Sequence, residues 1–329
     1  MLRIGVLGAG HLGKIHINCI KQIPEYELVG FYDPDKNTAA KVASEFGIKS
    51  FDTIDTLIDA VEVIDIVTPT IAHFECASKS LKKRRHVFIE KPIVTTPEEA
   101  NALIQLAEEA NVKVQVGHVE RFNPAFLAVQ NSIQNPMFVE AHRLALFNPR
   151  GTDVPVVLDL MIHDLDIVLS IIKSPVKSIC ANGVAVVSDT PDITTARVEF
   201  ENGAVANLTA SRISMKNMRK TRIFQPDAYI TVDFLDKKAE IVRIKDADNE
   251  TTNDPMAMVL DLPNGKSRQI LFDKPDVFPI NAIKTELERF NEAITNDTVP
   301  AVTIHDGVRV LQLAHDILKE VNKSVKNIK

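Results

Sequence analysis

The stretch LRIGVLGAGHLG, residues 2–13, decides the fold of this chain. Its first six residues are mostly apolar and predict a strand, a glycine-rich turn follows, and a helix continues to about Gln22. A second apolar run, residues 27–32, ends on Asp33, about 20 residues after Gly13. Strand, glycine turn, helix and acid in this order are the pattern by which α/β proteins bind a dinucleotide. A glycine turn in an unrelated α/β fold is the alternative, and the register of all four parts argues against it.

The turn has a physical role at each glycine. Gly8 makes the tight turn, Gly10 lets the backbone approach a pyrophosphate, and Gly13 lets the helix lie close to the strand. Backbone amides at the start of the helix, with the helix dipole behind them, favour the phosphate charge. The turn residues predicted to bind the cofactor are Gly8, Gly10, His11, Leu12 and Gly13.

Asp33 predicts which dinucleotide is bound. Its carboxylate accepts a hydrogen bond from a free ribose 2′-hydroxyl and repels a 2′-phosphate. NAD is therefore the predicted cofactor and NADP is less favoured, although Lys36 keeps the second cofactor open.

Composition places the chain among ordinary globular proteins of two-domain length. It has 329 residues, of which 45% are hydrophobic and 25% charged, and a formal net charge of −6. This charge argues against a nucleic-acid partner, and no apolar run is long enough to span a membrane. The three cysteines are far apart and odd in number, which predicts reduced thiols in a cytoplasmic protein.

Strands and helices alternate up to Arg121. Apolar runs predict strands at residues 2–7, 27–32, 61–67, 86–89 and 113–116, with a short one at 49–51. This alternation predicts a parallel, doubly wound sheet whose ligand lies at the carboxyl ends of the strands. We therefore expect an α/β fold in which residues 1–121 form a Rossmann dinucleotide-binding domain.

Beyond residue 121 the pattern changes to period two. Residues 194–200 and 204–210 alternate in polarity on either side of a turn, and 229–235 and 239–244 form a second pair. These hairpins predict that residues 122–329 form a substrate-binding α+β domain with an open, mostly antiparallel sheet. Amphipathic helices are expected at 281–296 and 305–322, and the sequence leaves open which domain the last one contacts.

The motif Glu90-Lys91-Pro92 stands at the end of a wholly apolar strand. Loops at this edge, including Thr68-Pro69, should line the cofactor crevice. An ammonium group placed there polarises an oxygen or, with a lowered pKa, moves a proton. The alternative is an ordinary Glu-Lys pair in a surface turn.

Asp159 and His163 lie four residues apart on a predicted helix, residues 157–172. Their neighbours are apolar, and buried polar groups need partners, so both should face a cleft or each other. Asp166 is three residues beyond His163 and is placed to orient its ring. The alternative is a core histidine satisfied by an aspartate. The stretch offers too few ligands for a metal, and hydride transfer to NAD needs none, so no metal site is expected.

Taken together, these motifs resemble the glucose-fructose oxidoreductase and inositol dehydrogenase family, written Gfo/Idh/MocA. The residues that carry the resemblance are Gly8–Gly13, Thr68-Pro69 with His73, Glu90-Lys91-Pro92, Gly117 with Arg121-Phe122-Asn123-Pro124, and Asp159–His163 with Asp166. The resemblance implies that Lys91 and His163 handle the proton and that Asp159 binds a substrate hydroxyl. It also places Thr68, Pro69, His73, Glu90 and Lys91 at the cofactor, with a cis bond before Pro92.

The same resemblance implies the reaction and the assembly. Members of the family join a Rossmann domain to an open-sheet domain, form dimers or tetramers through that sheet, and oxidise or reduce a sugar or cyclitol carbon. We therefore expect an NAD(P)-dependent dehydrogenase that forms a homo-oligomer.

A narrower resemblance concerns the substrate. Residues 117–124 and 159–164 are similar to members that oxidise the 3-hydroxyl of a UDP-N-acetylhexosamine. The diphosphate of such a substrate would be bound by Arg121, Arg143 or Arg150. Two alternatives remain: a dehydrogenase of a free sugar or cyclitol, and a sensor that binds the dinucleotide without catalysis.

Overall fold

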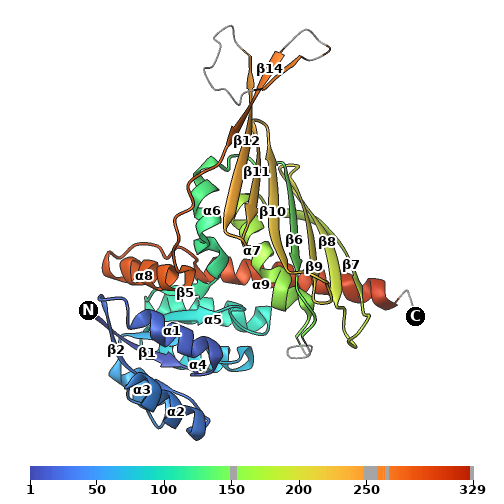
Figure 1. Cartoon of the computed structure of the whole chain (residues 1–329). Helices are drawn as coiled ribbons and strands as arrows, with labels where there is room; N and C mark the ends of the chain where they lie inside the picture. The colour runs from blue at the N-terminus through green and yellow to red at the C-terminus, as the bar shows by residue number, and fades with distance from the viewer. Residues whose placement is uncertain (149–153, 248–257, 262, 264–266, 327–329) are drawn as a thin grey trace. The chain divides into compact units, whose positions relative to one another are not determined.

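The computed structural model describes residues 1–148, 154–247, 258–261, 263 and 267–326. The chain divides into two compact units (Figure 1). Unit 1 contains Met1–Phe122 and Asn281–Gln312, and unit 2 contains Asn123–Ile280 and Leu313–Lys329. The segment 281–312, which the sequence pattern placed in the second domain, therefore packs with the first.

Unit 1 is built on five parallel strands in the order β2-β1-β3-β4-β5. They are β1 (Leu2–Leu7), β2 (Tyr26–Tyr32), β3 (Val63–Ile66), β4 (His86–Glu90) and β5 (Val114–Gly117). The order reverses between β1 and β3, which is where a doubly wound sheet binds its ligand. The predicted Rossmann-type sheet is confirmed. The short strand expected at 49–51 is instead an isolated bridge between Ser50 and Phe31.

Helices connect these strands. They are α1 (His11–Ile20), α2 (Lys36–Phe46), α3 (Ile54–Ala60), α4 (His73–Lys82) and α5 (Pro97–Ala110), with 3₁₀ turns at Thr70–Ala72 and Val119–Phe122. Local chemistry explains where α5 begins, because Thr96 and Glu99 form a capping box and Pro97 occupies the first turn. Helix α2 begins where the Asp35 side chain accepts from two backbone amides and ends at Gly47 in the left-handed region.

Two helices from the end of the sequence complete the core of unit 1. On α8 (Ala282–Thr295), Leu287 and Phe290 are fully buried, and the Phe290 ring lies 6.1 Å from that of Phe88. Helix α9 (Ile304–Lys326) begins in unit 1, where Gly307 packs on Val116, and ends in unit 2. The last helix thus contributes to both units, a question that the sequence left open.

Unit 2 is built on a nine-stranded sheet in the order β13-β14-β12-β11-β10-β6-β9-β8-β7. Every neighbouring pair is antiparallel except β6 and β9. The strands are β6 (Phe138–Leu144), β7 (Val176–Val184), β8 (Ile193–Phe200), β9 (Val205–Ser211), β10 (Met218–Gln225), β11 (Ala228–Asp233), β12 (Lys238–Asp246), β13 (Met258–Asp261) and β14 (Ser267–Asp273). The predicted open, mostly antiparallel sheet is confirmed.

Helices cover the apolar face of this sheet. Helix α6 (Pro124–Val129) lies against β11 and β12, and α7 (Ile162–Ile171) lies against β6. The helix expected at 157–172 is two elements, a π-helical turn at Val157–Met161 and then α7. No helix in the described part of the chain is both long and apolar enough to cross a membrane.

Candidate active site

The glycine turn has the geometry that a dinucleotide site requires. Gly8 has a φ of +94°, and a Cβ atom there would lie 2.6 Å from the carbonyl oxygen of Val67. A Cβ at Gly13 would collide with the carbonyl oxygen of Gly8, so helix and strand can approach this closely only with glycine. Gly10 precedes α1, and a Cβ at that position would meet no atom within 4 Å. This open space at a helix N-terminus fits a pyrophosphate.

Asp33 lies directly beside this turn. One carboxylate oxygen accepts from the amide of Ala9 at 2.8 Å and the other from the amide of Asp35 at 2.9 Å. The predicted ribose-binding acid is thus tied to the glycine turn and to the start of α2. Its half-buried carboxylate retains acceptor capacity for a ribose hydroxyl.

His73 holds together the loops after β3 and β4. Its two ring nitrogens lie 2.9 Å from the carbonyl oxygens of Thr68 and Pro92, and the ring is buried. Carbonyl oxygens only accept, so a neutral ring donates to one of them at a time. Burial lowers the pKa of His73, which favours that neutral ring. The bond between Lys91 and Pro92 is cis, as the family resemblance implied.

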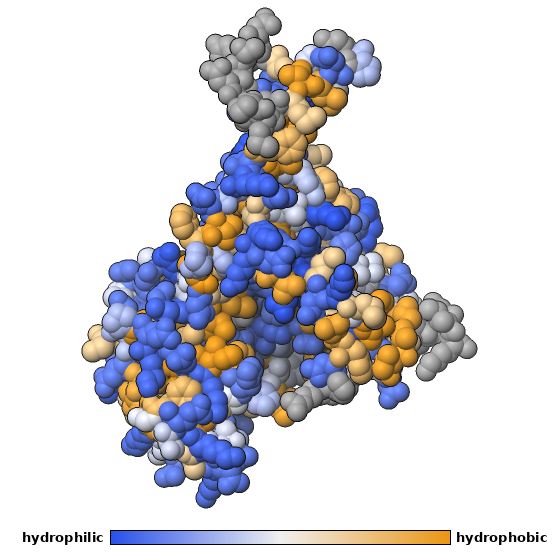
Figure 2. Space-filling view, in the orientation of Figure 1, coloured by the Kyte–Doolittle hydropathy of each residue, from blue (hydrophilic) through white to orange (hydrophobic). Residues whose placement is uncertain are grey.

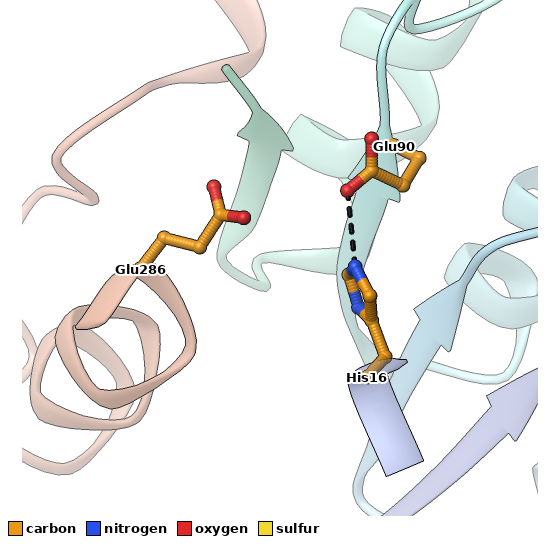
Figure 3. A group of neighbouring side chains, drawn as sticks. All are labelled: His16, Glu90 and Glu286. Atoms are coloured by element: carbon orange, nitrogen blue, oxygen red, sulfur yellow. Dashed lines mark ion pairs between the residues drawn. The ribbon is translucent and has the colours of Figure 1, made fainter. Parts of the chain in front are cut away.

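Glu90 turns away from the loop edge into the interior of unit 1. It is 8% exposed, and its carboxylate lies 3.1 Å from Nε2 of the buried His16. Nδ1 of His16 bonds Asp65 on β3 at 2.9 Å. Figure 3 shows Glu286 of α8 with its carboxylate directed toward Glu90 and His16. Lys91 follows Glu90 directly and is half-buried at the carboxyl end of the strand.

The sequence prediction missed three members of this group. Asp65 interrupts the apolar strand β3, and a charge inside a buried strand is a signal that a partner exists. His16 belongs to the buried face of α1, where a polar residue gives the same signal. Glu286 is likewise a polar residue on the buried face of its helix, α8, but the sequence does not show which unit that face packs against.

The predicted substrate residues of unit 2 lie around the π-helical turn. Asp159 is in the turn and His163 follows in α7, and both are half-buried. π-Helical turns inside α-helices occur frequently at functional sites. Asp166, predicted to orient the His163 ring, is fully buried.

The three predicted phosphate-binding arginines have different surroundings. Arg143 is 3% exposed, and two of its guanidinium nitrogens donate to the carboxylate of Asp164, both at 3.0 Å. Arg121 belongs to unit 1 and lies 3.9 Å from Asp306. Arg150 lies outside the described residues. Two of the three are therefore engaged by carboxylates of the protein.

Profiles of one protein family match both units. The profile of the GFO/IDH/MocA oxidoreductase family, an NAD-binding Rossmann fold, matches residues 2–118. The profile of the GFO/IDH/MocA C-terminal domain matches residues 138–231.

Individual relatives agree with the profiles. UDP-N-acetylglucosamine 3-dehydrogenase of Acidithiobacillus ferrooxidans is 41% identical over 241 residues, which cover 73% of this chain and 76% of that enzyme. A solved structure of that enzyme covers 98% of both chains at 35% identity, with a TM-score of 0.88. The scyllo-inositol 2-dehydrogenase (NAD(+)) of Bacillus subtilis is 27% identical over 331 residues, 95% of this chain and 92% of that enzyme. The scyllo-inositol dehydrogenase of Lactobacillus casei, solved with NAD(H) and scyllo-inositol, is 19% identical over 98% of this chain and 97% of its own, with a TM-score of 0.77, and shows likeness of fold alone.

The profiles of one family therefore match both units. The chain belongs to the GFO/IDH/MocA family of oxidoreductases and carries that family's NAD-binding Rossmann domain.

Proposed function

We propose that this NAD-dependent dehydrogenase oxidises the 3-hydroxyl of a UDP-linked N-acetylhexosamine to a ketone. The observation that carries this proposal is the likeness to UDP-N-acetylglucosamine 3-dehydrogenase, which extends over 98% of both chains. Unit 2, where substrate specificity is expected to reside, is included in that likeness.

Three side chains are assigned to the chemistry. NAD, when bound, accepts the hydride from the sugar carbon. A hydride leaves carbon readily only as the hydroxyl proton is withdrawn, so we assign His163 as the base and Lys91 as the group that polarises the oxygen, or the two in exchanged roles. Asp159 accepts a hydrogen bond from a substrate hydroxyl.

Cofactor binding is assigned to unit 1. The helix N-terminus at Gly10 takes the pyrophosphate, and Asp33 takes the ribose. His11, Leu12, Thr68 and Pro69 border this site, and His73 supports it by joining the two loops. NAD should bind more tightly than NADP because Asp33 repels a 2′-phosphate.

The diphosphate of the substrate needs a cation. Arg143 is held by Asp164, so its role is the support of α7 unless that ion pair rearranges. Arg150 is the arginine to which we assign the diphosphate, because guanidinium pairs bidentately with phosphate oxygens and a free sugar offers nothing to neutralise.

A free cyclitol is the second candidate substrate. It is favoured by the likeness to scyllo-inositol 2-dehydrogenase over 95% of this chain and by the internal pairing of Arg143. Such a substrate would need only hydroxyl contacts, such as those of Asp159.

We also propose a cytoplasmic homo-oligomer formed through the unit 2 sheet. Figure 2 shows hydrophobic residues gathered at the described end of the ribbon formed by β12, β13 and β14. The exposed apolar residues there are Met258, Val259, Leu260 and Phe272. Apolar surface of this kind on a sheet often marks an interface.

A substrate panel tests the proposal. NADH formation at 340 nm is followed with UDP-N-acetylglucosamine, UDP-N-acetylgalactosamine, free N-acetylglucosamine and scyllo-inositol, each with NAD and with NADP. We expect turnover of a UDP sugar with NAD, competitive inhibition by UDP, and weaker inhibition in Arg150→Ala. Saturable turnover of a free sugar or cyclitol that is indifferent to UDP would refute the substrate and leave the dehydrogenase assignment intact.

A further inference from the structure

Behind the Glu90-Lys91 turn lies a buried group of ionisable side chains that the assigned mechanism does not use. His16, Asp65 and Glu286 are 0% exposed, and Glu90 is 8% exposed. They come from α1, β3, α8 and β4, all within unit 1. Neither carboxylate oxygen of Glu286 has a hydrogen-bond partner among the described residues. Figure 3 shows that its carboxylate nevertheless points at Glu90.

The Glu90 carboxylate is held on three sides. Its Oε1 lies 3.1 Å from Nε2 of His16, an ion-pair contact that lacks hydrogen-bond geometry, and its Oε2 accepts from the backbone amide of Lys91 at 3.2 Å. On the third side it packs on Gly117, where a Cβ atom would lie 2.9 Å from Oε1. Because Glu90 and Lys91 are consecutive, a displaced Glu90 carboxylate would release the amide of Lys91 and move the lysine.

The stability of this buried group depends on how many of its carboxyl groups are ionised. If all three carboxylates were ionised, one imidazolium would face three negative charges in a space almost entirely shielded from water. Unbalanced buried charge costs several kcal/mol per ion. The group without hydrogen-bond partners, Glu286, is the one that gains least from ionising.

The pKa directions agree with this distribution. Burial lowers the pKa of His16, but Asp65 and then Glu90 outweigh it, so the pKa lies well above its usual value. Burial raises the pKa of Glu90, but His16 and Lys91 outweigh it and hold the pKa below its usual value. Burial and the negative charge of Glu90 raise the pKa of Glu286 well above its usual value.

The Cys19 thiol and the Tyr26 hydroxyl near these residues add no charge. Burial raises the pKa of the Cys19 thiol and of the Tyr26 hydroxyl, so both stay neutral. Two groups do carry weight in the balance. Asp65 is paired with His16, but burial outweighs the effect of His16 and holds the pKa of Asp65 above its usual value. Lys91 is the second cation.

We propose that His16 and Glu286 are positioning residues that, as an imidazolium and a neutral carboxyl group packed around it, fix the Glu90 carboxylate and through it Lys91. Asp65 holds the His16 ring by its Nδ1. This inference rests on the proposed function where it concerns turnover, but the protonation states that it assigns are independent of any substrate.

Histidine NMR tests the charge of His16 in the intact protein without a substrate. The chain has nine histidines, and with ¹⁵N-labelled histidine we expect one ring to carry protons on both nitrogens at pH 8. That signal should be missing from His16→Gln and present in His305→Gln, which replaces an exposed histidine of the same unit. A neutral His16 at pH 8 in the wild-type protein would overturn the proposal, even if the variant failed to fold.

Steady-state kinetics test whether His16 and Glu286 position Glu90 and Lys91. Without the imidazolium, only Lys91 opposes the effect of burial on Glu90, so the pKa of Glu90 rises. In His16→Gln the acid limb of the kcat profile should therefore move up by about one pH unit or more, and kcat should fall about tenfold with a smaller change in KM. Glu286→Gln, an uncharged isostere, should keep the acid limb where the wild type has it. An acid limb displaced in Glu286→Gln as in His16→Gln would contradict a protonated Glu286.

Metal analysis tests the alternative that a metal ion is bound among these side chains. The ligand atoms of His16, Glu90 and Glu286 lie within 4.8 Å of one another, and a histidine oriented by an aspartate is also how metal ligands are held. Elemental mass spectrometry of protein purified without chelator should find no stoichiometric zinc or manganese. One equivalent of metal per chain, absent from Glu286→Gln, would replace the protonated cluster by a metal site.

Discussion

At the scale of single residues, Lys91 and His163 carry the assigned chemistry. Lys91→Ala and His163→Ala should each lower kcat by roughly 100-fold or more, because each removes a group that handles the hydroxyl proton or its oxygen. NAD binding, measured by calorimetry, should persist in both. Lys113→Ala is the matched control, since that lysine pairs with the exposed Asp297 in the same unit and should leave turnover unchanged. Near-normal turnover in both active-site variants would refute the mechanism.

A second prediction at this scale concerns Asp192 of unit 2. This buried carboxylate accepts from the backbone amides of Val186, Val187 and Ser188 at 2.9, 2.7 and 3.0 Å. Burial raises its pKa, but these three hydrogen bonds outweigh burial and hold the pKa below its usual value. Asp192→Ala should cost about 1–3 kcal/mol of stability at pH 7, and Asp192→Asn less, because the amide oxygen still accepts.

The pH dependence of this effect has a definite sign. A carboxylate with a lowered folded pKa stabilises fully above the unfolded pKa of about 3.9, and the contribution is lost as the pH falls through the folded value. Urea unfolding from pH 7 to pH 3 should therefore show the difference between wild type and Asp192→Ala narrowing at the acid end. A difference that widens toward low pH would exclude an ionised Asp192.

At the scale of elements, the sequence predicted those helices, strands and turns whose formation depends on residues close together in the chain. The first strand, glycine turn and helix follow from residues 2–22, and the hairpin around Gly203 follows from its turn residues. Strands β7, β10, β13 and β14 were not predicted, because what makes them strands is pairing with partners distant in sequence. The π-helical turn was not predicted either, because its apolar residues show the same periodicity as those of an α-helix.

Helix α8 provides the element-scale prediction. Phe290 is fully buried against Phe88, so Phe290→Ala leaves a cavity in the core of unit 1 and should lower the free energy of unfolding by about 3–5 kcal/mol. Arg289→Ala, on the exposed face of the same helix, should change it by less than about 0.5 kcal/mol. Denaturant unfolding measures both. Equal effects of the two variants would mean that α8 is not part of this core.

At the scale of the whole molecule, the division into units is what the sequence predicted least well. The boundary near residue 122 followed from the change of periodicity, but nothing in residues 281–312 marks them as partners of a sheet formed before residue 118. The same holds for the candidate site, of which only a part could be predicted from the sequence. Motif residues such as Gly10, Asp33 and Lys91 could be proposed as site residues from local pattern, whereas Glu286 entered the candidate site only once α8 was placed in unit 1.

The division into two units predicts which segments NAD protects from hydrogen exchange. A ligand that binds only the folded protein stabilises it by RT ln(1 + [L]/Kd), about 2.7 kcal/mol at a concentration one hundred times Kd. Amides of unit 1 that exchange through unfolding of the whole unit should then exchange about 100-fold more slowly, and α8 should be protected together with β1 and β4, although it is remote in sequence. Hydrogen exchange with mass spectrometry, with and without NAD, resolves these peptides. Protection of β1 and β4 without protection of α8 would mean that the helix opens independently, and that the Glu286 carboxylate is not held permanently against Glu90.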